Sequence, residues 1–302
     1  MSERTTVTVR VPAKVNVQLA VGAARPDGFH DLANVFLAVS LFDEVTATVA
    51  GELTVTCAGP DADQVPLDRT NLAARAAEIL AARAGIAPAV HLHIAKNIPV
   101  AGGMAGGSAD GAAALLACDT LWGLGTPRAE LLDICAELGS DVPFSLVGGA
   151  ALGTGRGELL TPVDAGAFHW VFAVADGGLS TPAVFREFDR LTAGTRIPEP
   201  QASPALLAAL ASGDPDALAA TLANGLQEAA LSLRPQLAAT LDAGTGAGAL
   251  AALVSGSGPT TAFLVRDAEA AAKVAAALDA SGTCRATRVA ASPAPGATVL
   301  PS

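Results

Sequence analysis

Positive charge and aromatic side chains are both scarce in this chain of 302 residues. Lysine and arginine total 18 against 29 aspartates and glutamates, which gives a net charge of −11. A surface this acidic repels the phosphate backbone of DNA or RNA, so we expect no nucleic-acid partner. Only 4% of the residues are aromatic and tyrosine is missing. We therefore expect a core built mainly from alanine, leucine and valine.

Signals for membranes and for secretion are missing as well. The sequence has no run of about 18 apolar residues, the length that a membrane-spanning helix needs. Its start, MSERTTVTVRVPAK, has no apolar stretch of the kind found in signal peptides. The four cysteines, at positions 57, 118, 135 and 284, lie far apart and form no CxxC motif. We therefore expect a reduced, cytoplasmic protein with incidental thiols and no membrane partner.

The apolar content is nevertheless high enough for a large core. Hydrophobic residues make up 51% of the chain, which argues against general disorder. Strand-like and helix-like segments are mixed without strict strand–helix–strand order, so we predict the α+β class. The length fits two domains of ordinary size. A glycine-rich stretch at 148–157 is expected to close the first of them.

Residues 5–19 alternate almost perfectly between apolar and polar side chains, which predicts a strand with one buried face. Pro12 indicates an edge position or a bulge in this strand. Lys14 and Asn16 project from its polar face. Lysine is rare here, at three of 18 basic residues, so one retained inside a motif is informative. The common interpretation is a solvated side chain, and the functional alternative is a cation that neutralises phosphate charge.

The rest of the chain is predicted to form short strands and helices. Strands are expected near 35–41, 44–50, 53–57, 90–95, 169–175, 250–254, 260–265 and 284–290. Helices are expected near 70–84, 108–121, 127–138, 182–191, 204–211, 215–231, 234–243 and 267–280. Thr70 or Asn71 would cap the first helix. Residues 192–203 are expected to form a surface loop.

The segment PVAGGMAGGSAD, residues 99–110, combines four glycines with the start of a helix. Glycines let the backbone approach a ligand, and a helix start offers unpaired N–H groups, so the pattern favours a phosphate site. Ser108 could cap the helix or contact a phosphate or its metal. The loop lacks the Gly-Lys-Ser/Thr of a Walker A motif, and it fits a dinucleotide fingerprint poorly. A glycine-rich connector without a ligand remains the structural alternative.

Two other polar segments could carry chemistry. Asp141 lies in GSDVPF, where it could cap a helix or accept a proton from a substrate hydroxyl group. The segment VSGSGPT, residues 254–260, is a second glycine-rich turn between strands.

Of the four histidines, His30 directly follows an aromatic residue. Phe29 and His30 adjoin in a turn, and such a pair can hold a flat base by stacking and edge contacts. His91 and His93 share one face of a predicted strand and are interpreted as surface residues, because no third metal ligand is in view. His169 is interpreted as structural.

Taken in order, PAKVN, PVAGGMAGGSAD and VSGSGPT resemble the GHMP kinase superfamily, and the pattern covers nearly the whole chain. PAKVNVQLAVGAARPDGFHDL and LGSDVPF are further similar to the branch that phosphorylates 4-diphosphocytidyl-2-C-methyl-D-erythritol. The resemblance implies an N-terminal α+β domain (1–160), a C-terminal ferredoxin-like domain (161–302) and an active-site cleft between them. It also implies ATP as the phosphate donor, Mg²⁺ and a small-molecule substrate linked to cytidine diphosphate.

The resemblance assigns roles to individual positions. Lys14 and Asp141 match the catalytic lysine and aspartate. Phe29 and His30 would bind cytosine, whereas Asn16 and Thr181 would contact the erythritol or its phosphate. Asn71 and Lys96 would lie near adenine. The ATP phosphates would rest on Pro99, Val100, Ala101, Gly102, Gly103, Met104, Ala105, Gly106, Gly107, Ser108 and Ala109. It assigns no metal ligands, and it leaves the oligomeric state open.

Two positions depart from the pattern of this branch. Phe29 stands where tyrosine is usual, so a ring face is kept for stacking but any hydroxyl contact is lost. Ala109 and Asp110 stand where many relatives have serine and asparagine. Asp110 would bring negative charge close to ATP unless it points outward or helps to hold Mg²⁺.

The mechanism implied is transfer of a phosphoryl group, with Asp141 taking the proton of the attacking hydroxyl and Lys14 neutralising charge. Three alternatives remain. The closest is another GHMP kinase, acting on homoserine or on a mevalonate. A non-catalytic nucleotide sensor is the second, although such a protein is expected to have lost Lys14 or Asp141. A nicotinamide dehydrogenase is a distant third.

Overall fold

The structure is a computed structural model that describes residues 5–301. Its strands are β1 (Thr6–Ala24), β2 (His30–Val49), β3 (Thr54–Ala58), β4 (Val90–Ala95), β5 (Ala150–Thr154), β6 (Leu159–Pro162), β7 (Phe168–Val174), β8 (Ala223–Asn224), β9 (Ala251–Val254), β10 (Thr261–Val265), β11 (Ala286–Ser292) and β12 (Thr298–Val299). Its α-helices are α1 (Leu72–Ala84), α2 (Gly106–Trp122), α3 (Arg128–Leu138), α4 (Val142–Val147), α5 (Thr181–Leu191), α6 (Pro204–Ser212), α7 (Pro215–Ala219), α8 (Gln227–Leu233), α9 (Gln236–Gly246) and α10 (Ala268–Ser281). A 3₁₀ turn, η1, spans Ala62–Gln64.

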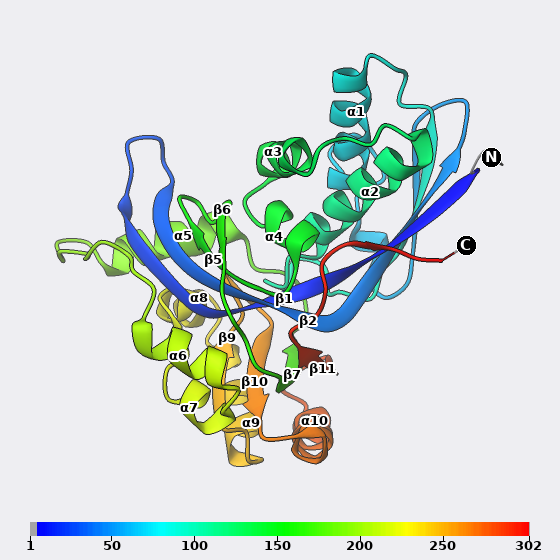
Figure 1. Cartoon of the computed structure of the whole chain (residues 1–302). Coiled ribbons are helices and arrows are strands. Elements are labelled where there is room, and N and C mark those ends of the chain that lie inside the picture. Colours follow the sequence, from blue (N-terminus) through cyan, green and yellow to red (C-terminus); the bar gives the residue numbers. More distant parts are fainter. Residues whose placement is uncertain (1–4, 302) are drawn as a thin grey trace.

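Two sheets organise the chain, which confirms the predicted α+β class. The first has the order β12-β1-β2-β4-β3; β5 also pairs with β2, β6 pairs with β5, and β8 pairs with β1. The second is antiparallel, with the order β11-β7-β10-β9. Figure 1 shows β1 and β2 as two long paired strands that cross the molecule, with α1 to α4 on one side and the second sheet on the other.

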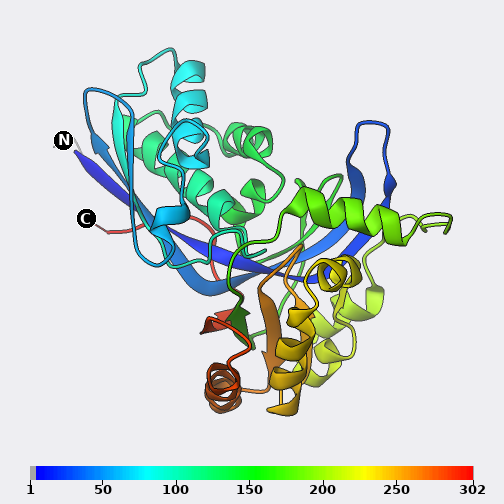
Figure 2. The same cartoon turned by 180° about the vertical axis from the view of Figure 1, so that it is seen from behind.

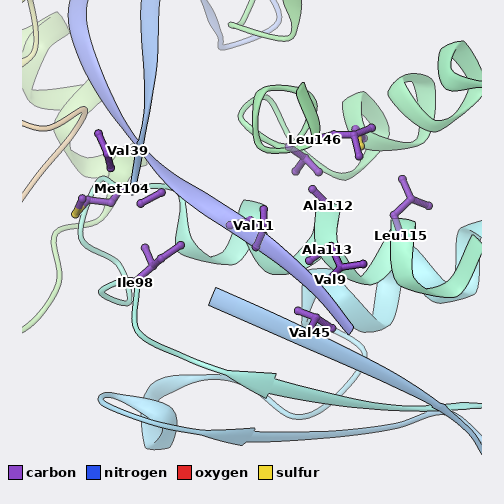
Figure 3. Packing of buried hydrophobic residues seen from close by; sticks show 14 of the residues in the cluster. Val9, Val11, Val39, Val45, Ile98, Met104, Ala112, Ala113, Leu115 and Leu146 are labelled. Atoms are coloured by element: carbon purple, nitrogen blue, oxygen red, sulfur yellow. The ribbon is translucent and has the colours of Figure 1, made fainter. Parts of the chain in front are cut away.

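The alternating pattern of β1 builds the main core. The valine face of the strand is buried, and Val9, Val11 and Val15 are fully inaccessible. These side chains pack toward α2, whose alanines Ala112 and Ala113 let the helix come close to the sheet (Figure 3). The same rigid strand and helix carry Lys14 and the glycine-rich loop. Packing of the core therefore fixes both parts relative to each other.

The two candidate site residues on the polar face of β1 are buried, although such side chains are commonly solvated. Lys14 and Asn16 are 5% and 1% exposed, so the solvated lysine is wrong for this strand. Pro12 lies at a shift in the β1–β2 register, which confirms the predicted bulge. On its other side β1 pairs with β12 only at Val9 and Arg10, which precede Pro12.

The structure corrects the predicted elements in two places. The strands expected at 35–41 and 44–50 are one continuous strand, β2. The helix expected at 215–231 is instead α7, the short strand β8 and α8. Asn224 breaks it, because its side-chain amide donates to the carbonyl groups of Val254 and Gly256.

Smaller features follow the sequence more closely. Asn71 is the cap of α1, and its side chain accepts the amide hydrogen of Ala73. The stretch 148–157 contains β5, which pairs with β2 in the first sheet, and residues 192–203 contain no helix or strand. In the part of the chain from 5 to 301, no helix is both long and apolar enough to cross a membrane.

Candidate active site

A cleft of about 640 Å³ lies where the two halves of the molecule face each other. One wall is formed by the polar face of β1 and by the hairpin that leads into β2. The glycine-rich loop and the start of α2 form the floor, and α5 with the turn at 256–258 forms the opposite wall. Seen from behind in Figure 2, α5 runs beside the β1–β2 hairpin.

The glycine-rich loop is held in place by backbone contacts on two sides. The amide of Lys14 donates to the carbonyl of Met104 at 3.3 Å, and Ser255 Oγ donates to the carbonyl of Gly103 at 3.1 Å. Gly103 has a φ of +75°, and a Cβ there would lie 2.1 Å from the Ser255 carbonyl oxygen. Only glycine therefore fits at this contact between the two glycine-rich turns.

The loop delivers the N-terminus of α2 to the cleft. Ala105, with a φ of +60°, is the N-cap residue, and it offers no side-chain acceptor. Ser108 does not cap the helix, since it lies inside the first turn, and it lines the cleft. The first turn contains no acidic residue. Its unpaired N–H groups and the positive end of the helix dipole suit the phosphates of a nucleotide.

Not every residue predicted to bind ATP lines the cleft. The lining includes Ala101, Gly102, Gly103, Ala105, Gly106, Gly107 and Ser108. Met104 and Ala109 are fully buried in the core instead. Pro99 and Val100 also lie outside the lining, at the start of the loop.

Lys14 and Asp141 meet at the base of the cleft. Their Nζ and Oδ2 atoms are 3.4 Å apart, and the two side chains are 6% and 30% exposed. Asp141 occupies the N-cap position of α4, but its carboxylate makes no capping hydrogen bond. That carboxylate is therefore directed to a cation and to solvent, which is the arrangement that a general base needs.

Neighbouring amides fix the Lys14 ammonium. Nζ donates to Asn16 Oδ1 at 2.7 Å, and Asn16 Nδ2 donates to Asn34 Oδ1 at 2.7 Å. A Cβ at Gly256 would lie 3.0 Å from Asn16 Oδ1 and 3.2 Å from Lys14 Nζ. This second glycine-rich turn thus leaves room for the ammonium group from the opposite wall.

The far end of the cleft is aromatic. Phe29 is 49% exposed, and the Arg156 guanidinium lies 5.2 Å from its ring centre. His30 is the first residue of β2, and its ring stacks on Phe185 with a centroid distance of 4.9 Å. Nε2 of His30 lies 2.8 Å from Asp189 Oδ1. These rings suit a flat heterocycle.

Thr181 is the first residue of α5, and its hydroxyl lies 2.8 Å from Ser257 Oγ. Both residues line the cleft. Phe185 and Asp189 follow Thr181 at intervals of four residues, so all three share one face of α5. That spacing was the signal that could have identified Phe185 and Asp189 as site residues. Asn34 and Ser257 gave no such signal, because only the fold brings them near Asn16 and Thr181.

The predicted adenine contacts lie outside the lining of the cleft. Asn71 uses its side chain to cap α1 and to donate to the Pro66 carbonyl. Lys96 is buried, and its Nζ donates to Asp43 Oδ2 at 2.5 Å and to Asp110 Oδ2 at 2.7 Å.

Asp110 neither points outward nor lines the cleft, because it is buried and pairs with Lys96. Burial raises the pKa of Asp110 to about 8; Asp43 adds to the rise and the Lys96 ammonium opposes it. Asp110 is therefore part of the packing beneath the loop.

No group of three or more histidine, cysteine, aspartate or glutamate side chains is positioned to hold a metal ion within residues 5–301. His91 and His93 bond to Thr56 on the neighbouring strand, as surface residues do. A metal ion that used this cleft would need ligands from a substrate as well.

Comparisons with known proteins agree on one family. The family described as GHMP kinases N terminal domain matches residues 71–149, and GHMP kinases C terminal matches residues 206–284. A 4-diphosphocytidyl-2-C-methyl-D-erythritol kinase from Streptomyces avermitilis is 78% identical over 295 residues, which cover 97% of this chain and 99% of the relative. Another from Thermobifida fusca is 59% identical over 309 residues, covering 99% and 100%.

Solved structures share the architecture. A crystal structure of 4-(cytidine 5'-diphospho)-2C-methyl-D-erythritol kinase matches with a TM-score of 0.76 and 31% identity, covering 94% of this chain and 98% of the other. Homoserine kinase from Cytophaga hutchinsonii gives a TM-score of 0.75 at 21% identity, with 99% of each chain covered. The second match shows a shared fold only.

Proposed function

This chain belongs to the GHMP kinase family, and we propose that its cleft transfers the γ-phosphoryl group of ATP to the C2 hydroxyl of 4-diphosphocytidyl-2-C-methyl-D-erythritol. That reaction is the kinase step of the non-mevalonate isoprenoid pathway. The observation that carries the proposal is the pairing of Lys14 with Asp141 at 3.4 Å between a phosphate-binding loop and an aromatic pocket.

Asp141 is the proposed general base. Its carboxylate accepts the proton of the C2 hydroxyl as the oxygen attacks the γ-phosphorus of ATP. The bond between the γ-phosphorus and the β,γ-bridging oxygen breaks, and ADP leaves with that oxygen. The uncapped carboxylate of Asp141 supports this role, because no backbone amide competes for its lone pairs.

Lys14 is the proposed electrostatic partner. Its ammonium group is held by Asn16 and faces Asp141, so it lies where it can neutralise the charge that develops on the hydroxyl oxygen and the γ-phosphate. A buried cation acts more strongly than a solvated one, because little water screens it. The amides of residues 102–108 would hold the ATP phosphates.

The aromatic end of the cleft is proposed to bind the cytosine base. Phe29 and Phe185 offer ring faces, and His30 offers a polar edge between them. Arg156 and Arg186 also line the cleft and carry positive charge for the diphosphate group. The C2 hydroxyl is tertiary and hindered, so binding energy from this remote end would orient it for attack. Asn16 and Thr181 would contact the erythritol unit.

Mg²⁺ fits the cleft only as a partner of the nucleotide. Mg²⁺ is commonly held by one or two carboxylates together with substrate phosphates. The Ser108 hydroxyl is an oxygen donor that the cleft offers beside the loop. When bound, the ion would neutralise negative charge on the phosphates, and the phosphate oxygens would hold it together with Ser108. We also place the reaction in the cytoplasm, because all four cysteines are free thiols.

The test is release of ADP from Mg-ATP with a panel of acceptors. The panel contains 4-diphosphocytidyl-2-C-methyl-D-erythritol, its uridyl analogue, methylerythritol 4-phosphate, homoserine and mevalonate. We expect turnover with the cytidyl compound and little with the others. Turnover with homoserine or mevalonate instead would keep the family and refute the acceptor. ATP binding without turnover of any acceptor would favour a nucleotide sensor.

A further inference from the structure

His30 is held by three side chains of α5 that lie far from it in the sequence. Its ring stacks on Phe185 and meets Phe188 edge-on, with centroid distances of 4.9 and 5.9 Å. Asp189 Oδ1 lies 2.8 Å from Nε2. The His30 side chain is 4% exposed, whereas that of Asp189 is 41% exposed. Packing therefore fixes the ring plane, and one carboxylate fixes which nitrogen points to α5.

The second ring nitrogen of His30 is the one left for a ligand. Within residues 5–301, no side chain or backbone group hydrogen-bonds to Nδ1. His30 nevertheless lines the cleft together with Phe29. One nitrogen is thus committed to the protein, and the other remains for a molecule bound in the cleft.

We propose that Asp189 is a positioning residue that selects cytosine over uracil by fixing the tautomer of His30. The proposal rests on the proposed function, since it assumes that the base of the acceptor binds at this end of the cleft. An ionised carboxylate only accepts hydrogen bonds, so Nε2 must carry the proton and donate it to Asp189. In the neutral ring, Nδ1 then has a bare lone pair and can only accept.

That lone pair discriminates between the two pyrimidines at position 4. Cytosine carries an amino group there, which donates a hydrogen bond to an acceptor. Uracil carries a carbonyl oxygen there, which would place two lone pairs against each other. A site built to pair with a donor rejects an analogue that lacks it, because its own polar group is left unpaired. The arrangement assigns the cytosine preference to Asp189 acting through His30.

Asp189→Asn tests this role while keeping the shape of the side chain. The amide can accept a hydrogen bond from a protonated Nε2 or donate one to an unprotonated Nε2, so the tautomer is no longer imposed. We expect the ratio of kcat/KM for the cytidyl compound to that for its uridyl analogue to fall at least 10-fold. The loss should appear mainly in KM for the cytidyl compound, with kcat within about threefold, because Lys14 and Asp141 are unchanged.

Two other variants of α5 provide the controls. Glu187→Gln removes a charge two residues away, where the side chain bonds to Arg190 and Ser232 and does not line the cleft. It should keep the wild-type ratio. Asp189→Glu keeps the carboxylate and should recover part of the preference. A second readout is ¹⁵N NMR of histidine-labelled protein, with His30→Ala used to assign the signal.

The outcomes distinguish a failure of the role proposed for Asp189 from a failure of the proposed function. The proposal predicts that wild-type His30 is neutral and protonated on Nε2, and that Asp189→Asn gives a mixture of tautomers. An unchanged base preference in Asp189→Asn, or a wild-type His30 protonated on Nδ1, would overturn the role of Asp189 and leave the proposed function intact. Wild-type protein that turned over neither pyrimidine compound would contradict the proposed function itself.

Discussion

Single residues of the cleft could be predicted where short motifs contain them. Lys14, Asp141 and His30 lie in segments with a distinctive local pattern, and the fold places all three in the lining of one cleft. Asn34 could not be predicted, because its role depends on the β1–β2 register that places it beside Asn16. Lys96 is the opposite case. The family resemblance implied a contact with adenine, whereas two buried carboxylates hold its ammonium group.

At this scale the sharpest prediction concerns the general base. Asp141→Asn keeps the size of the side chain but cannot take a proton, so kcat should fall roughly 10²-fold or more. KM for ATP should change little, because the loop at 101–108 is untouched. Steady-state kinetics measure both values. Asp133→Asn, on the exposed face of α3, is the matched control and should retain wild-type kinetics. Near-normal turnover of Asp141→Asn would mean that another group accepts the proton.

At the scale of elements, the errors have a common physical cause. Two strands were expected, at 35–41 and 44–50, and aspartate is a residue type that is disfavoured inside strands. In the structure Asp43 is fully buried within β2, where its carboxylate accepts the amides of Asn97 and Ile98. The partners that make this acceptable are more than 50 residues away in the sequence. Local propensity cannot register them.

Asp43 also belongs to a buried cluster of charges that joins three elements beneath the glycine-rich loop. Asp43 on β2, Lys96 after β4 and Asp110 on α2 form one buried charged cluster. Two carboxylates share a single ammonium group there, and the remaining oxygen of Asp110 has no hydrogen-bond partner. Above the pKa of Asp110, removing this second negative charge should therefore stabilise the fold, whereas removing the ammonium group should destabilise it strongly.

This predicts a pH-dependent gain in stability from Asp110→Asn. The pKa of Asp110 is about 8 in the folded protein against 3.8 as the ordinary value. A raised carboxyl pKa gives stability that is full below pH 3.8 and is lost as the pH rises through about 8. The asparagine variant carries no such charge, so its advantage over the wild type should grow from pH 5 to pH 9. Linkage gives about 1.4 kcal/mol for each pH unit between pH 5 and the folded pKa of about 8, so we expect the growth to reach about 4 kcal/mol.

Thermal unfolding at several pH values measures the difference, with Asp133→Asn as the exposed control. A difference between wild type and Asp110→Asn that stays constant from pH 5 to pH 9 would contradict the raised pKa. Lower stability of Asp110→Asn at pH 9 would contradict the surplus of negative charge.

At the scale of the whole molecule, the sequence predicted the class of fold but not that segments from its second half pair with β1. The division at 160/161 stays a prediction. The first sheet contains β8 and β12, which come from the second half of the sequence. Strands of two residues have no recognisable pattern of their own. Only their pairing with β1 makes them strands, and that pairing depends on the complete fold.

The last residues of the described chain should therefore stabilise the N-terminal half. Ala294, Ala297 and Leu300 donate backbone hydrogen bonds to the carbonyls of Ala38, Ser145 and Thr8, and Gly149 donates to Ala294. At about 0.5–1.5 kcal/mol for each bond, truncation after Ser292 should cost roughly 2–6 kcal/mol.

Chemical denaturation of the truncated protein measures that loss. Truncation after Leu300 keeps all four bonds, so it is the control and should unfold like the full chain. Equal stability of the chain ending at Ser292 and the full chain would show that the C-terminal segment does not support the first sheet.

The position of the transferred phosphate tests the central claim most directly. ³¹P NMR of the product formed from ATP and 4-diphosphocytidyl-2-C-methyl-D-erythritol shows which carbon carries the new phosphomonoester. The C2 carbon bears no hydrogen, so we predict a new phosphorus signal without three-bond coupling to a proton. A phosphomonoester signal split by protons would place the phosphate on C1 or C3, and it would contradict the orientation proposed for the C2 hydroxyl between Asp141 and ATP.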